Sequence, residues 1–141
     1  MKIEPPLSIR QTADVTGLSV HTLRYYERIG LLGPLPRGGD GHRRFRAEDL
    51  TWIAFLGRLR ATGMTIRDMV RFAQLRRQGP RTVGLRRRML EAHAADVERK
   101  MAVLGESLRV VREKIVTYQT MERNDDGRQP VSEGIGKAGG D

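Results

Sequence analysis

One short segment near the N-terminus carries the side chains best suited to hold an anion. In residues 20–28, Leu23 lies on a face that suits burial, whereas His21, Arg24 and Tyr25 fall on other sides of a helix. Imidazole, guanidinium and phenol groups all donate hydrogen bonds. A helix that presents them outward in a row is typical of a surface that an anionic partner covers.

A second group of cationic side chains flanks a glycine-rich segment at residues 38–41. Arg37 precedes this segment, and Arg43, Arg44 and Arg46 follow it. A nucleotide-binding phosphate loop would require Lys and then Ser or Thr after the glycines, and this pair is missing. The arginines therefore favour contacts with an external anion over a nucleotide-binding loop.

The net charge indicates the same kind of partner. The 141 residues include 26 Lys and Arg against 17 Asp and Glu, for a net charge of +9. Residues 1–80 hold 14 of the basic and 7 of the acidic side chains, so most of the excess lies in this half. Such an imbalance is expected of a domain that binds a polyanion.

The composition excludes several other classes of function. The chain has no cysteine, which excludes disulfides, zinc fingers, iron–sulfur clusters and thiol chemistry. His21, His42 and His93 lie far apart, without carboxylates at a spacing that suits a metal site. We therefore expect no catalytic residue, no metal site and no cofactor. Without a long apolar run or a signal peptide, we expect a cytoplasmic protein with no membrane contact.

Two short helices are predicted at the N-terminus. Ser8 and Gln11 have the spacing of a capping box, and they predict a helix over residues 9–16. Ser19 can cap a second helix over residues 20–28. Because only Gly17, Leu18 and Ser19 separate them, the pair forms a helix-turn-helix.

The next residues predict a small β-hairpin and a second pair of helices. Pro and Gly residues between 31 and 46 are turn signals, and we expect a hairpin with a glycine-rich tip. A helix should then run from Ala47 to near Gly63, and another should begin after Thr65. The segment 78–80 breaks the pattern, which makes it the expected domain boundary.

The second half of the chain predicts one long helix with a narrow apolar seam. Residues 82–123 repeat apolar side chains at alternating spacings of four and three, which is typical of a coiled coil. The seam can pack against a second copy of the chain or fold back onto residues 1–78, and the length of the helix favours the second copy. The predicted dimer interface consists of Leu90, Val97, Met101, Leu104, Leu108, Val111, Ile115 and Tyr118. We thus expect a helix-turn-helix domain (1–78), a linker (79–81), a dimerisation helix (82–123) and a disordered tail (124–141).

These elements together resemble the MerR family of bacterial transcriptional regulators. The resemblance covers residues 8 to about 120, and its most specific part is Thr22-Leu23-Arg24-Tyr25-Tyr26-Glu27. Gly41-His42-Arg43-Arg44-Phe45 and Leu59-Arg60-Ala61-Thr62-Gly63-Met64 carry it further. It implies a mainly α fold, with a winged helix-turn-helix and a long helix that forms an antiparallel coiled coil in a homodimer. It also implies that the dimer binds and distorts a palindromic promoter, which realigns promoter elements for RNA polymerase.

The resemblance also implies roles for particular side chains. His21 would approach base edges in the major groove, while Arg43 and Arg44 would grip phosphates and the loop with Arg37 would form the wing. The complete candidate DNA-binding set is Ser19, His21, Thr22, Arg24, Tyr25, Tyr26, Arg37, Arg43, Arg44 and Arg60. Metal-sensing and thiol-sensing members of the family carry cysteines, so these mechanisms are excluded here.

Two other functions remain open at the level of sequence. An architectural DNA-binding protein would share the basic charge but show little sequence preference. An interaction protein would use the coiled coil to recruit another chain, although this would leave Arg24, Tyr25 and the arginines near the glycines without a role.

Overall fold

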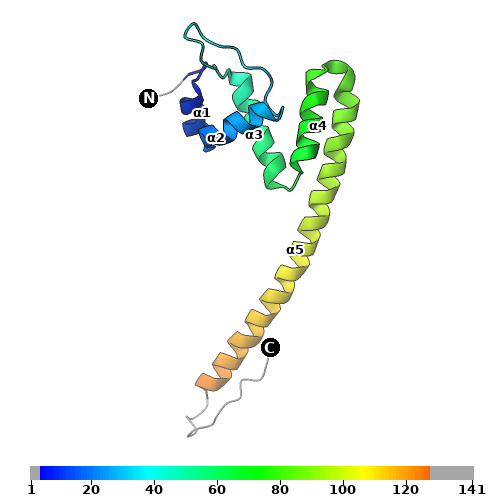
Figure 1. Cartoon of the computed structure of the whole chain (residues 1–141). Coiled ribbons are helices and arrows are strands. Elements are labelled where there is room, and N and C mark those ends of the chain that lie inside the picture. The colour runs from blue at the N-terminus through cyan, green and yellow to red at the C-terminus, as the bar shows by residue number, and fades with distance from the viewer. Residues whose placement is uncertain (1–3, 128–141) are drawn as a thin grey trace. The chain divides into compact units, whose positions relative to one another are not determined.

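The computed structural model describes residues 4–127, which are mainly helical (Figure 1). The elements are α1 (Ile9–Thr16), α2 (Val20–Arg28), α3 (Ala47–Ala61), α4 (Ile66–Arg77), the 3₁₀ turn η1 (Pro80–Thr82) and α5 (Val83–Asp126). They divide into two compact units, Met1–Val97 and Glu98–Asp141. The expected order of helices, with a long helix at the end, is confirmed.

The helix-turn-helix forms because local hydrogen bonds end one helix and begin the next. Ser8 and Gln11 make the reciprocal bonds of a capping box, at 3.2 Å (Gln11 N to Ser8 Oγ) and 2.9 Å (Ser8 N to Gln11 Oε1). Gly17 ends α1 with a φ of 78°, a left-handed conformation that glycine adopts without strain. Ser19 Oγ then accepts a 3.0 Å hydrogen bond from the backbone of Thr22, which starts α2.

The core of the first unit lies where α1 to α4 meet. Phe45, Leu56 and Leu31 are fully buried at its centre. Trp52 is also buried, and its Nε1 donates a 2.8 Å hydrogen bond to the backbone oxygen of Leu31. This bond ties the middle of α3 to the segment that follows α2.

The predicted β-hairpin wing is not present as a hairpin of paired strands. Residues 4–127 contain only two isolated antiparallel bridges, Leu7 with Phe45 and Arg37 with Arg43. Around the second bridge, Gly38 N donates to His42 O at 2.8 Å and Arg44 N donates to Pro36 O at 2.8 Å. Pro34 and Pro36 have no N–H to extend a ladder, so the segment forms a tight loop instead. We call residues 36–44 the glycine loop.

The turn at η1 leads into a helix whose first turns belong to the first unit. Thr82 is buried, and its hydroxyl donates to the backbone oxygen of Leu75 at 2.5 Å. Met89 and Leu90 of α5 then pack against the core, and Figure 1 shows α4 beside this part of α5. The segment 79–81, which the sequence predicts to be a linker, is therefore a tight turn that returns the chain to its own core.

The later part of α5 makes no tertiary packing of its own. All residues from Glu98 to Gly127 are exposed, and the apolar side chains among them include Met101 at 64% and Leu104 at 68% exposure. Residues 124–126 are helical, although the sequence predicts the start of a tail there, and residues 128–141 of that tail lie outside the described part. No helix in the described range is long and apolar enough to cross a membrane.

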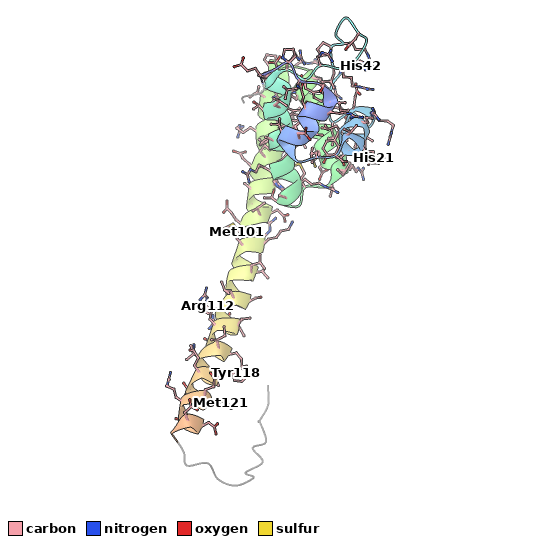
Figure 2. All side chains as sticks on the ribbon, turned by 90° about the vertical axis from the view of Figure 1, so that its left-hand side faces the viewer. His21, His42, Met101, Arg112, Tyr118 and Met121 are labelled. Carbon is pink, nitrogen blue, oxygen red and sulfur yellow. The ribbon has the colours of Figure 1, made fainter. Side chains whose placement is uncertain are left out.

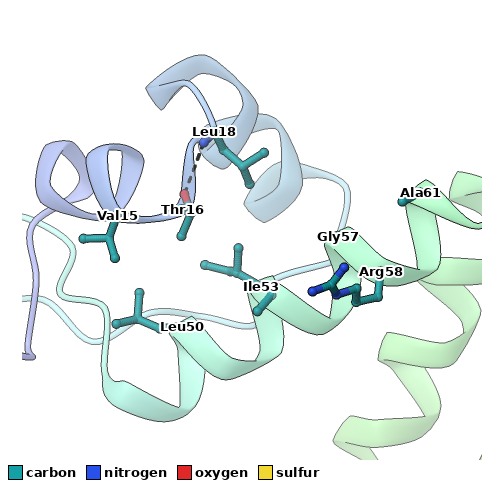
Figure 3. Close-up of a pocket in the computed structure, with 9 residues that line it drawn as sticks. Val15, Thr16, Leu18, Leu50, Ile53, Gly57, Arg58 and Ala61 are labelled. Carbon is teal, nitrogen blue, oxygen red and sulfur yellow. Dashed lines mark hydrogen bonds between the residues drawn. The ribbon is translucent and has the colours of Figure 1, made fainter.

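A hollow of about 420 Å³ lies between the α1–α2 turn and α3 (Figure 3). Val15 and Leu18 line one side, and Leu50 and Ile53 line the other. Thr16 Oγ1 accepts a 3.3 Å hydrogen bond from the backbone of Leu18, which fixes the turn above this hollow. The hollow thus lies within the contact between the helix-turn-helix and α3.

Candidate nucleic-acid interface

Helix α2 turns its polar side chains outward, as its pattern predicts. His21, Arg24 and Tyr25 are exposed, whereas Leu23 is 1% exposed and anchors the helix in the core. The guanidinium of Arg28 lies 5.4 Å from the centre of the Tyr25 ring. Within the first unit, Figure 2 shows His21 of α2 and His42 of the glycine loop on the same side.

Three members of the candidate set are partly engaged within the chain. Tyr26 is 9% exposed, and its backbone oxygen accepts bonds from Leu31 at 2.9 Å and Leu32 at 3.2 Å. The Ser19 hydroxyl donates to Thr22 Oγ1 at 3.0 Å. Ser19 and Thr22 therefore position the start of α2, and Tyr26 holds its end.

Acidic neighbours position the arginines of the glycine loop. Arg43 Nε pairs with Glu27 of α2, and both side chains are largely covered. Arg44 Nη2 pairs with Asp40 at 2.9 Å, and Arg37 Nη1 donates to the backbone oxygen of Gly41 at 2.9 Å. The Glu27–Arg43 pair fastens the loop to α2.

The electrostatics of the loop centre on Asp40. A hydrogen bond from the backbone N–H of His42, and then one from the Arg44 guanidinium, hold the pKa of Asp40 below its ordinary value. The carboxylate is thus fully ionised at neutral pH. The Asp40 carboxylate keeps the tip of the glycine loop folded and holds the Arg44 guanidinium beside it.

A cleft of about 720 Å³ joins α1, α2 and the glycine loop. Arg24, Arg43 and Arg44 of the candidate set all line it. Two further basic residues line this cleft, Arg10 and His42, and the candidate set predicted from the sequence does not include them. The exposed position of Arg10 in the first turn of α1 was the signal that could have identified it.

The remaining candidates lie outside this cleft. Arg37 belongs to the glycine loop but does not line the cleft, and Arg60 is exposed near the end of α3. Arg46, which is not in the candidate set, is held by Asp49, whose Oδ2 lies 3.0 Å from its Nε. The hydrogen bond and the ion pair with Asp49 raise the pKa of Arg46. This side chain therefore stays charged and bound to Asp49.

The cleft combines a positive charge with outward hydrogen-bond donors. Its cations outnumber its acids, since Asp40 is the one carboxylate among the lining residues. Arginines are well suited to bind phosphate groups, because a guanidinium can donate two parallel hydrogen bonds to them. In residues 4–127, no group of three or more His, Cys, Asp and Glu side chains could hold a metal ion.

The predicted dimer seam is divided between two environments. Leu90 packs against the core of its own chain, and Val97 is half-buried. The others are exposed on α5, and these are Met101, Leu104, Leu108, Val111, Ile115 and Tyr118.

Comparisons with known proteins give the family. Residues 7–75 match the model described as MerR HTH family regulatory protein, and residues 50–113 match the model described as MerR, DNA binding. An HTH-type transcriptional regulator of Haemophilus influenzae is 35% identical over 109 residues, which are 77% of this chain and 81% of that protein.

Two solved structures are similar along most of the chain. HiNmlR, a MerR family regulator that lacks the sensor domain, was solved bound to promoter DNA. It is 32% identical with a TM-score of 0.76, over 84% of this chain and 94% of that one. A MerR family transcriptional regulator from Listeria monocytogenes is 34% identical with a TM-score of 0.79, over 85% and 95% of the two chains. The chain described here therefore belongs to the MerR family of helix-turn-helix transcriptional regulators.

Proposed function

We propose that the chain binds a palindromic promoter site as a homodimer and distorts the DNA to control transcription. The observation that carries this proposal is the cleft in which Arg24 of α2 meets Arg43 and Arg44 of the glycine loop. A recognition helix and a basic loop on one surface can contact a groove and the flanking phosphates together. HiNmlR, which is 32% identical to this chain, was solved bound to promoter DNA, and this supports promoter DNA as the partner.

Each candidate side chain then has a role that its surroundings allow. His21 reads base edges, and Arg24 and Tyr25 contact phosphates or bases, because all three are exposed on α2. Ser19, Thr22 and Tyr26 orient α2, and they contact the phosphate backbone of the DNA.

The second set of contacts comes from outside α2. Arg43 and Arg44 grip phosphates beside the groove, and Arg37 does so from the glycine loop. Arg60, exposed near the end of α3, contacts the DNA backbone further along the site. Most of these contacts supply affinity and salt dependence, while His21 supplies sequence preference.

The partner chain binds along the exposed face of α5. Met101, Leu104, Leu108 and Val111 follow a heptad spacing and are between 49% and 68% exposed. A stripe of this kind is covered when a second helix packs against it. We infer an antiparallel coiled coil between two copies of α5. RNA polymerase is then affected indirectly, through the shape of the promoter.

Fluorescence anisotropy tests this function. The full chain is titrated onto the duplex upstream of its own gene and onto a scrambled duplex, at several salt concentrations. A preference of about 10³-fold or more for the first duplex supports a specific regulator, and the salt slope gives the number of phosphate contacts. Equal, steeply salt-dependent binding to both duplexes supports the architectural alternative, and no binding to either contradicts both functions.

A further inference from the structure

A second hollow lies away from the DNA-binding cleft and shares no lining residue with it. It measures about 490 Å³ and opens between α3, α4 and the first turns of α5. All of its lining residues belong to the first unit, and they are Glu48, Thr51, Trp52, Phe55, Phe72, Arg76 and Arg86. We call it the aromatic pocket.

Three aromatic rings form the floor of the aromatic pocket. The Trp52 and Phe72 rings stack at 5.9 Å with 13° between their planes. Phe55 lies 6.0 Å from each of them and is only half-buried. An array of ring faces and edges of this kind favours contact with another flat, apolar ring.

Two guanidinium groups flank this floor without an acidic partner in residues 4–127. Arg76 lies over the Trp52 ring at 4.2 Å and makes no ion pair with a described residue. Arg86 is held in place because its Nε donates to Thr82 Oγ1 at 3.1 Å and its Nη2 to Gly79 O at 3.1 Å. These bonds leave Nη1 of Arg86 to bind another acceptor.

The acid at the aromatic pocket does not neutralise these cations. Glu48 lies 3.5 Å from Arg46, its ion-pair partner outside the pocket. The lining therefore carries two guanidiniums and one carboxylate, a net charge of +1, beside an apolar floor. A ligand that fits it needs a flat ring and a negative group at one end.

We propose that the aromatic pocket binds a small planar aromatic carboxylate. The ring lies on Phe55, the half-buried ring of the floor, and the carboxylate accepts hydrogen bonds from Arg76 and Arg86. The volume lies within the range of roughly 300–1,000 Å³ that small-molecule sites occupy. A carboxylate bound by two guanidiniums gains charge-assisted hydrogen bonds that a neutral ring cannot form.

The floor of the aromatic pocket is linked to the helix that faces DNA. Trp52 Nε1 donates to Leu31 O at 2.8 Å, and Leu31 N donates to Tyr26 O at 2.9 Å near the end of α2. A ligand that shifts the Trp52 ring changes the support of α2, so ligand and DNA affinities become coupled. This coupling, unlike the binding of the ligand itself, rests on the proposed function.

Isothermal titration calorimetry of the full chain without DNA tests the site. The probe is 2-naphthoate, and 2-naphthylmethanol has the same ring without the charge. We expect the alcohol to bind at least about tenfold more weakly, and the variants Arg76→Gln and Arg86→Gln to weaken naphthoate binding by a similar factor. Arg71→Gln is the matched control, because Arg71 is exposed on α4 and does not line the pocket.

Several results would contradict the proposal that the aromatic pocket binds this ligand. They are no heat with millimolar naphthoate, equal affinity for the alcohol, and equal weakening by Arg71→Gln. Arg76→Gln does not remove the bonds that hold η1, so it tests the site even where Arg86→Gln unfolds the chain. A shift of the monomer–dimer equilibrium by Arg76→Gln, without naphthoate binding, assigns this face to a second copy and also overturns it.

The coupling has a separate readout. Anisotropy on the upstream duplex is measured with and without saturating naphthoate. A change of DNA affinity supports the coupling, and unchanged affinity contradicts it. Since the calorimetry contains no DNA, a failure of the proposed function does not affect the result for the site.

Discussion

At the scale of single residues, Arg24 differs from Arg43 and Arg44 in having no acidic partner among the described residues. Arg43 is paired with Glu27 and Arg44 with Asp40, whereas Arg24 is exposed on α2 and makes no ion pair in the described part of the chain. An unpaired guanidinium at the cleft can bind phosphate without first breaking a contact of its own.

We expect Arg24→Ala to weaken binding to specific and random DNA alike. The slope of log affinity against log salt should become shallower by about one contact. Anisotropy at four or more salt concentrations measures both quantities. Arg67→Ala, at an exposed position on α4, removes the same charge outside the cleft and serves as the control. An unchanged slope with unchanged affinity for Arg24→Ala would remove this residue from the phosphate contacts.

Asp40 has the opposite role, because it holds a cation of the loop. Its pKa is lowered in the folded chain, so its contacts are complete above the ordinary value of about 3.9 and are lost as the pH falls through the lowered value. Between about pH 5 and pH 8, Asp40 stays ionised and adds no pH dependence. We expect Asp40→Asn to release Arg44 and to strengthen binding to random DNA at pH 7. Weaker binding in the same anisotropy assay would mean that the ordered loop matters more than the released charge.

At the scale of elements, the left-handed turn at Gly17 decides how α1 and α2 meet. No atom lies within 4 Å of a Cβ built at Gly17 or at Gly57, so both sites have room for a methyl group. Gly17 has a φ of +78°, whereas Gly57 lies inside α3. Gly17→Ala should lower the free energy of unfolding by about 1 kcal/mol, and Gly57→Ala should raise it by roughly 0.5–1 kcal/mol. Urea unfolding that gave both variants the same sign would contradict this conformational reason.

The coiled coil can be tested with two neighbouring residues of α5. Leu104 and Val103 are 68% and 67% exposed, but only Leu104 belongs to the heptad seam. Leu104→Asp should dissociate the dimer because it places a charge in the apolar interface, whereas Val103→Asp should leave the dimer intact. Sedimentation velocity distinguishes these results. A dimer that survives Leu104→Asp, or that is lost equally in both variants, would exclude this seam.

The sequence predicts elements well where neighbouring residues determine them. The capping box at Ser8 and the turn at Gly17 depend on hydrogen bonds within a few residues, and both are present. The wing depends on pairing between two arms, and this pairing is limited to the single bridge of Arg37 with Arg43, so the predicted hairpin of paired strands is not present. The aromatic pocket joins Trp52 with Arg76 from another helix. The spacing of residues within one helix does not predict such a contact.

Prediction of the candidate site was similarly uneven. The outward face of α2 follows from helical periodicity, so the exposure of His21, Arg24 and Tyr25 could be predicted. The ion pairs of Arg43 and Arg44 could not, because they depend on how the glycine loop folds against α2. The DNA-binding roles of these residues stay predictions until they are measured.

At the scale of the whole molecule, the two units obtain their stability differently. Residues up to Val97 enclose a core of their own. From Glu98 onward, every described side chain is exposed, although ordering each residue of a helix costs about 1–2 kcal/mol of backbone entropy. In the proposed homodimer, association with a second copy would offset that cost, and association obeys mass action.

Because a second copy is proposed to cover the exposed second half of α5, the thermal stability of this part should depend on protein concentration. A midpoint of helix melting, followed by circular dichroism at 222 nm, should rise when the protein is concentrated from about 2 µM to about 200 µM. Dilution alone should melt this part of α5 at a temperature where residues up to Val97 stay folded. A midpoint that does not depend on concentration would show that the helix is stable by itself. If the midpoint rises with concentration, the amount of dimer able to span a DNA site will depend on how much of the chain the cell contains.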